Sequence, residues 1–266
     1  IYKAVETNGR RTVRCPLKEG KDLSYTIDFD RLEALASDPK NTLLILCNPH
    51  NPVGRVWTRQ ELLMVSQICL RHHVFVISDE IHCDLIMPGH TFTSFASLSE
   101  ENAANTMTCI APSKTFNLAG LEASCVILPD RERRHQLKAE MSRVSYEGRV
   151  NALGYKAMEA AYTRCDQWLS QAIQAIHSNH RLLTEFLKEH CPDVKAAPLE
   201  GTYLQWLDLR ALGWTPKEQE SIMEEADLFF DEGGMFGPEG EGFERMNLAC
   251  PQTVILDGLG RFSQVV

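Results

Sequence analysis

Residues 42–55 of this chain read TLLILCNPHNPVGR, and this stretch decides the fold. The continuous apolar run over 42–47 has the length of a strand and carries no polar alternation, which indicates a strand buried on both faces. It ends in a turn-rich segment over 48–54. A helix over 58–72 is then predicted by the capping box with which it begins. Strand, loop and helix in this order are typical of a parallel α/β sheet.

The same alternation of strand and helix continues along the first half of the chain. Three further apolar runs have the length of strands: 74–78, 107–111 and 123–128. In open α/β sheets, ligands bind beyond the carboxyl ends of the strands. Asn51, Asp79 and Lys114 follow three of these strands, so we expect their side chains to lie at one edge of the sheet.

The second half is organised differently. Its predicted elements are helices over 151–162 and 166–190, a strand over 201–209, a helix after the capping box at 215–218, a glycine-rich segment over 231–242 and a strand over 243–250. We therefore expect an α/β fold with a mostly parallel sheet and helices on both faces over residues 1–165. The linking helix and a smaller C-terminal α+β domain would occupy residues 166–266.

Composition excludes several classes of protein. The 266 residues include 27 Lys and Arg and 36 Asp and Glu, a net charge of −9, which argues against a nucleic-acid partner. No apolar run approaches the roughly 20 residues that span a bilayer, so we expect no membrane partner. Nine scattered cysteines favour reduced thiols and a cytoplasmic location. The residues around His82 fit no common metal site, and we expect no metal.

A lysine, an aspartate and an asparagine at one sheet edge have a specific chemical use. The neutral amine of a buried lysine forms a Schiff base with an aldehyde. A carboxylate beside a pyridine nitrogen keeps that nitrogen protonated, so the ring withdraws electrons. An amide can donate to a phenolate oxygen on the same ring. These are the groups that pyridoxal phosphate requires.

Five segments make the chain similar to a known family: 48–55 (NPHNPVGR), 78–82 (SDEIH), 113–120 (SKTFNLAG), 200–208 (EGTYLQWLD) and 243–251 (FERMNLACP). They resemble the fold-type I pyridoxal-phosphate enzymes of the aminotransferase class I/II superfamily, and most closely the cystathionine β-lyase branch called the MalY/PatB family. The resemblance runs through essentially the whole chain. It implies the pyridoxal-phosphate-dependent transferase fold, with an incomplete large domain, and pyridoxal 5'-phosphate as cofactor.

The resemblance also implies roles for individual residues toward the cofactor. Lys114 would be the lysine that binds the cofactor covalently and later removes the α-proton of the substrate. Asp79 would pair with the pyridine nitrogen, and Asn51 would donate to the phenolate oxygen. His82 occupies a nearby position that holds a tyrosine in related aminotransferases. Ser113 would contact the phosphate.

For substrate and reaction, the resemblance implies that Arg245 binds the α-carboxylate of an amino acid, for which a guanidinium offers a matching fork. The expected function is a carbon–sulfur β-lyase that cleaves L-cystathionine or a related cysteine S-conjugate to a thiol, pyruvate and ammonia. An aminotransferase is one alternative, because the same residues serve both reactions. The resemblance further implies a homodimer.

Two features depart from the family pattern. Many aminotransferases place a serine three residues before the lysine and an arginine eight residues after it, and this chain has Ala111 and Glu122 there. Family members are also longer at the N-terminus, so we expect this sequence to be part of a longer polypeptide. A truncated, non-catalytic interaction protein is the alternative from a different functional class.

Overall fold

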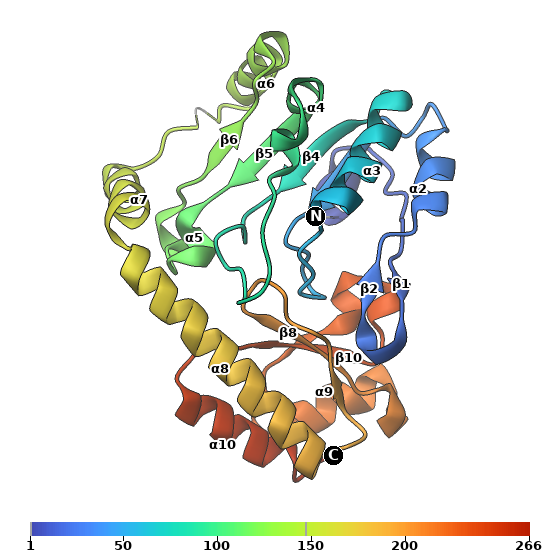
Figure 1. Cartoon of the computed structure of the whole chain (residues 1–266), viewed down its shortest axis with the longest axis vertical. Helices are drawn as coiled ribbons and strands as arrows, with labels where there is room; N and C mark the ends of the chain where they lie inside the picture. The colour runs from blue at the N-terminus through green and yellow to red at the C-terminus, as the bar shows by residue number, and fades with distance from the viewer. Residues whose placement is uncertain (1, 147) are drawn as a thin grey trace.

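The computed structural model describes residues 2–146 and 148–266 and contains two separate four-stranded sheets (Figure 1). The first sheet has the order β3-β4-β5-β6, in which β3 and β4 and also β4 and β5 are parallel, whereas β6 is antiparallel to β5. The bounds are Leu43–Cys47, Phe75–Asp79, Thr106–Ile110 and Cys125–Ile127. The predicted α/β class and mostly parallel sheet are confirmed.

One face of this sheet is covered by helices α2 (Phe29–Ala36) and α3 (Arg59–Arg71). Their apolar side chains form one core with Trp57, Val76 and other buried residues. The opposite face is much less covered, since Leu43 is 48% exposed and Val126 50% exposed. Helical cover is more extensive on the first face, while on the other face Arg133 of α6 (Arg131–Arg143) lies over the ring of Phe75, 4.3 Å from its centroid.

The helix α3 begins where its capping residues predict. Thr58 and Glu61 form the capping box of α3, with each side chain bonded to the backbone of the other residue. Helices α7 (Ala152–Arg164) and α8 (Asp166–His190) match the predicted ranges within two residues. The helix α6 (Arg131–Arg143) was not predicted, because none of its residues is buried and its sequence has no apolar stripe.

The second sheet lies against α8 and has the order β7-β8-β10-β9, with antiparallel pairing throughout. Its strands are β7 (Lys195–Ala196), β8 (Leu204–Asp208), β9 (Asp231–Glu232) and β10 (Phe243–Asn247). The predicted strand over 201–209 begins only at residue 204, because the preceding residues bond to a loop of the first half. The division into two domains at residue 165 stays a prediction.

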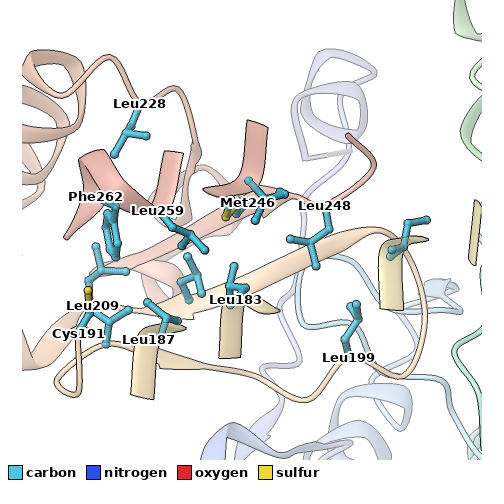
Figure 2. Close-up of a cluster of buried hydrophobic side chains, with 14 of the residues drawn as sticks. Leu183, Leu187, Cys191, Leu199, Leu209, Leu228, Met246, Leu248, Leu259 and Phe262 are labelled. Atoms are coloured by element: carbon cyan, nitrogen blue, oxygen red, sulfur yellow. The ribbon is translucent and has the colours of Figure 1, made fainter. Parts of the chain in front are cut away.

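Between α8, this sheet and α10 (Gln252–Phe262) lies a large apolar core (Figure 2). Leu183 and Leu187 of α8 point toward Met246 of β10 and Leu259 of α10 in the figure. Leu85 and Met87, which come from the first half of the chain, belong to the same core. The two halves are thus joined by shared apolar packing as well as by polar contacts.

The remaining elements are short. They comprise the helices α1 (Tyr2–Thr7), α4 (Glu100–Ala104), α5 (Pro112–Thr115) and α9 (Pro216–Glu225), and the hairpin strands β1 (Lys18–Glu19) and β2 (Tyr25–Thr26). Within residues 2–146 and 148–266, no helix is long and apolar enough to cross a bilayer.

A buried ion-pair network connects the loop after β3 to the second half. The Arg55 guanidinium donates to Glu200 (Nε–Oε2 2.8 Å), to Glu61 of the α3 capping box (Nη2–Oε2 3.0 Å) and to the carbonyl of Tyr25. The three charged side chains are only 13–20% exposed. Gly201 approaches this loop so closely that a Cβ there would lie 2.7 Å from Val56 Cγ2.

We expect Arg55→Met to lower the free energy of unfolding by roughly 2–3 kcal/mol, because two largely buried carboxylates would lose their shared cation. The matched control is Arg71→Met, since Arg71 pairs with Glu33 on the surface and is 61% exposed. That change should cost less than about 1 kcal/mol. Urea unfolding of both variants tests this, and equal losses would contradict it.

Candidate active site

Asn51 is held by a compact turn after β3. The His50 amide donates to the carbonyl of Arg55 (2.7 Å), and the Gly54 amide donates to the carbonyl of His50 (2.8 Å). The Asn48 amide donates to the carbonyl of Asp79 (3.0 Å), which ties the turn to the end of β4. The sequence therefore brings Asn51 and Asp79 to the same sheet edge, as predicted.

Asp79 ends β4 and is half-buried. Burial raises the pKa of its carboxyl, while the Ile81 amide (3.3 Å) and the charge of Lys114 act in the opposite direction. The register places Cys47 and Cys109 directly on either side of it. Burial raises the pKa of the Cys47 thiol to about 12 and also raises that of Cys109, so both thiols stay protonated. Asp79 therefore has no thiolate beside it at neutral pH.

Lys114 lies on the short helix α5 at the end of β5, and its side chain is exposed. The next residue, Thr115, is buried and its hydroxyl donates to Asp84 Oδ2 (2.9 Å). This bond fixes α5 against the turn that carries His82. Ser113 is half-buried on the same helix, and its contact with a phosphate stays a prediction.

His82 is a buried imidazole that is uncharged at neutral pH. It is 2% exposed, and its ring lies edge-on to Tyr203 with centroids 5.6 Å apart. Burial, together with the charges of Lys114 and Arg245, lowers its pKa to about 4. Its Nδ1 has no hydrogen-bond partner among the residues that the structure describes. A neutral ring with a free polar atom is suited to a polar ligand at this place.

Arg245 comes from β10 of the second sheet and contacts the residues of the first sheet through a hydrogen bond to Asn51. Its Nη1 donates to Asn51 Oδ1 (2.8 Å), while Nε and Nη2 both donate to Asp231 Oδ2 (3.0 and 2.6 Å). The guanidinium also lies over the ring of Phe236, 4.7 Å from its centroid. Its side chain is 15% exposed.

Five of the six predicted site residues thus lie in one neighbourhood, although they come from four separate segments of the chain. They are Asn51, Asp79, His82, Lys114 and Arg245, and the sixth is Ser113. The side chains of Asn51 and Arg245 are in direct contact, and the charge of Lys114 acts on Asp79 and His82. Sequence reasoning missed Asp231, whose pairing with Arg245 depends on strand register. It did not predict the contact of Tyr203 with His82 either: Tyr203 is half-buried, packs against the large apolar core and lies edge-on to the His82 ring.

Known proteins resemble this chain in sequence and fold. Residues 1–259 match the family described as aminotransferase class I and II. Cystathionine β-lyase PatB of Bacillus subtilis is 46% identical over 98% of this chain and 67% of its own length. The structure of cystalysin from Treponema denticola, which contains pyridoxal 5'-phosphate, superposes with a TM-score of 0.96 at 44% identity over 99% of this chain and 67% of its own.

A third similar structure is the pyridoxal-phosphate-bound C–S lyase of Staphylococcus hominis, with a TM-score of 0.89 at 31% identity over 98% of this chain and 64% of its own. The chain spans about two thirds of the length of these relatives. Fold, site and sequence agree on the class of protein, and the chain belongs to the aminotransferase class I and II family.

The donor groups fit the cofactor of these relatives. Lys114 offers an amine for an aldehyde, and Asp79 offers a carboxylate whose Oδ1 accepts only a long 3.3 Å bond within the described residues. The orphaned Nδ1 of His82 can meet a polar atom of the ring. Within residues 2–146 and 148–266, no three His, Cys, Asp or Glu side chains are grouped as metal ligands.

The buried His82 should make folding pH-dependent. Its pKa is about 4 in the folded state, against about 6.5 in the unfolded chain, so the unfolded state binds the additional proton between these values. His82 should therefore contribute a loss of stability of about 1–2 kcal/mol as pH falls from 7 to 5, in addition to the loss from His50, whose pKa burial also lowers to about 4. Unfolding of wild type and His82→Asn at both pH values tests this. The variant should lose less stability, whereas the exposed-site control His90→Asn should behave as wild type; equal losses in all three proteins would refute the assignment.

Proposed function

We propose that this chain carries the catalytic part of a pyridoxal-phosphate-dependent C–S β-lyase, which cleaves L-cystathionine or a related cysteine S-conjugate to a thiol, pyruvate and ammonia. The observation that carries the proposal is the convergence of Lys114, Asp79, Asn51, His82 and Arg245 from four segments. The lyase reaction, as opposed to another reaction of the family, is supported by the relatives named cystathionine β-lyase and C–S lyase.

Bound pyridoxal phosphate supplies an aldehyde that condenses with amines and a ring that withdraws electrons from the substrate's α carbon. Asp79 would face the ring nitrogen, where its carboxylate stabilises a proton. Asn51 and His82 would face the phenolate oxygen, and a neutral His82 adds no charge there. Ser113 is the proposed contact for the phosphate. Two further phosphate contacts of many aminotransferases, a serine and an arginine, are replaced here by Ala111 and Glu122, which cannot donate to a phosphate through their side chains.

Lys114 would act as both base and acid. Its neutral amine takes the proton from the substrate's α carbon, and the resulting ammonium can donate a proton to the sulfur as the bond from the β carbon breaks. Arg245 would hold the α-carboxylate, which orients the α C–H bond toward Lys114. The exposure of Lys114 leaves its amine free to reach either atom.

The activity is tested by incubating the protein with pyridoxal phosphate and L-cystathionine, then measuring thiol and pyruvate without any added keto acid. We expect both products in equal amounts. Lys114→Ala should lose turnover by at least about a thousandfold with its fold intact, whereas the surface control Lys138→Ala should keep it. Transfer of the amino group to an added keto acid, without thiol release, would instead identify an aminotransferase. No thiol, no pyruvate and no transfer of the amino group would favour an interaction protein.

We also propose a homodimer and a cytoplasmic location. Large apolar side chains are exposed around the start of α7: Tyr146 is 62% exposed, Leu153 74% and Tyr155 61%. Large apolar side chains that are exposed to this extent are typical of interfaces between subunits. All nine cysteines are free of disulfides, which is the rule in the reducing cytoplasm.

Light scattering of the purified protein should give twice the 30.0 kDa mass of the chain. Leu153→Asp should shift the population toward monomers, because it places a charge within an apolar contact. The control Leu256→Asp changes a leucine that is 47% exposed on α10, away from this patch, and should leave the mass unchanged. A monomeric wild type would contradict the proposal.

A further inference from the structure

We propose that Asp231 is a positioning residue that orients Arg245 for the carboxylate of an amino-acid substrate. This inference rests on the proposed function, in which Arg245 binds that carboxylate. Asp231 lies on the edge strand β9 and is the cross-strand partner of Arg245 on β10. Its role is to hold one edge of the guanidinium so that the rest of the group faces the substrate.

The hydrogen bonds of Arg245 to Asp231 and Asn51 leave two of its N–H groups available for a ligand. A guanidinium has five N–H groups: one on Nε and two on each terminal nitrogen. Asp231 accepts from Nε and from one N–H of Nη2, and Asn51 accepts from one N–H of Nη1. One N–H on each terminal nitrogen remains for a ligand. When Asn51 takes the N–H of Nη1 that faces the side-chain stem, the two that remain point the same way, as a bidentate contact with a carboxylate requires.

The position of Asp231 is itself tightly constrained. Gly233, which follows β9, lies so close to the carbonyl of Gly240 that a Cβ would approach its oxygen to 2.0 Å. Phe236 from the same segment covers one face of the guanidinium. The segment after β9 therefore cannot move outward without losing the packing around Arg245, and the carboxylate stays at the edge of the guanidinium.

The charge of Asp231 has a second consequence. It stabilises the cation that is mostly buried between Asn51 and Phe236, so the guanidinium does not have to rotate toward solvent for a partner. Asp231 Oδ1 accepts none of these bonds, and the side chain is 46% exposed. Asp231 thus affects the substrate through Arg245, with no part in proton transfer at Lys114.

The test compares two ligands of the cofactor-loaded protein, L-alanine and ethylamine, which differ only in the carboxylate. Dissociation constants come from the change in cofactor absorbance on titration. Asp231→Asn should weaken L-alanine about tenfold and leave ethylamine unchanged, and Asp231→Glu should recover part of the loss. Glu232→Gln is the matched control, because it removes the same charge from the neighbouring exposed residue of β9 and should change neither constant.

Kinetics provide a second readout. Asp231→Asn should raise KM for the sulfur substrate about tenfold with kcat nearly unchanged, since the reacting groups at Lys114 are untouched. Tighter binding of L-alanine by the variant would overturn the proposal, because Asp231 would then compete with the substrate for Arg245. Equal weakening of both ligands would overturn it too, as a general structural effect.

The binding experiment separates this inference from the proposed function. A wild type that prefers L-alanine to ethylamine, yet releases no thiol, would refute the lyase reaction while the effect of Asp231 on L-alanine could still support its positioning role. A wild type that binds the two ligands equally would overturn the positioning role, because no carboxylate would then be bound by Arg245.

Discussion

The Arg55 guanidinium with its two carboxylates is the interaction on which the arrangement of the site depends. Arg55 follows the turn that carries Asn51, Glu61 lies in the first turn of α3, and Glu200 lies between β7 and β8 of the second sheet. One cation thus joins the loop, the helix that packs on the first sheet and the segment that leads to β8. Because the pairs are largely buried, removal of the cation would leave two carboxylates without compensation.

This junction connects the loop after β3 to the segment between β7 and β8, so it helps to hold the two sheets beside one another. The first sheet alone presents Asn51, Asp79 and Lys114 at its edge. The arginine that completes the site stands on the second sheet, and its 2.8 Å bond to Asn51 forms only when the two sheets are docked. The shared apolar core, to which Leu85 and Met87 contribute from the first half, also holds the two halves together.

Burial explains why the pKa values of ionisable groups in the site differ from those in water. Burial raises the pKa of Asp79 and lowers that of His82 to about 4, while Lys114 stays exposed. At neutral pH the imidazole is uncharged, and the neighbouring thiols on β3 and β5 stay protonated.

The sequence by itself determined the α/β class, the strands β3, β4 and β5, and the three polar groups that follow them, because apolar runs and capping boxes are local patterns. Family motifs further indicated His82 and Arg245. It did not predict α6, which buries nothing, or the antiparallel direction of β6. Only the tertiary structure decided that Asp231 lies beside Arg245 and Tyr203 beside His82, since strand register and ring packing depend on contacts between residues far apart in the chain.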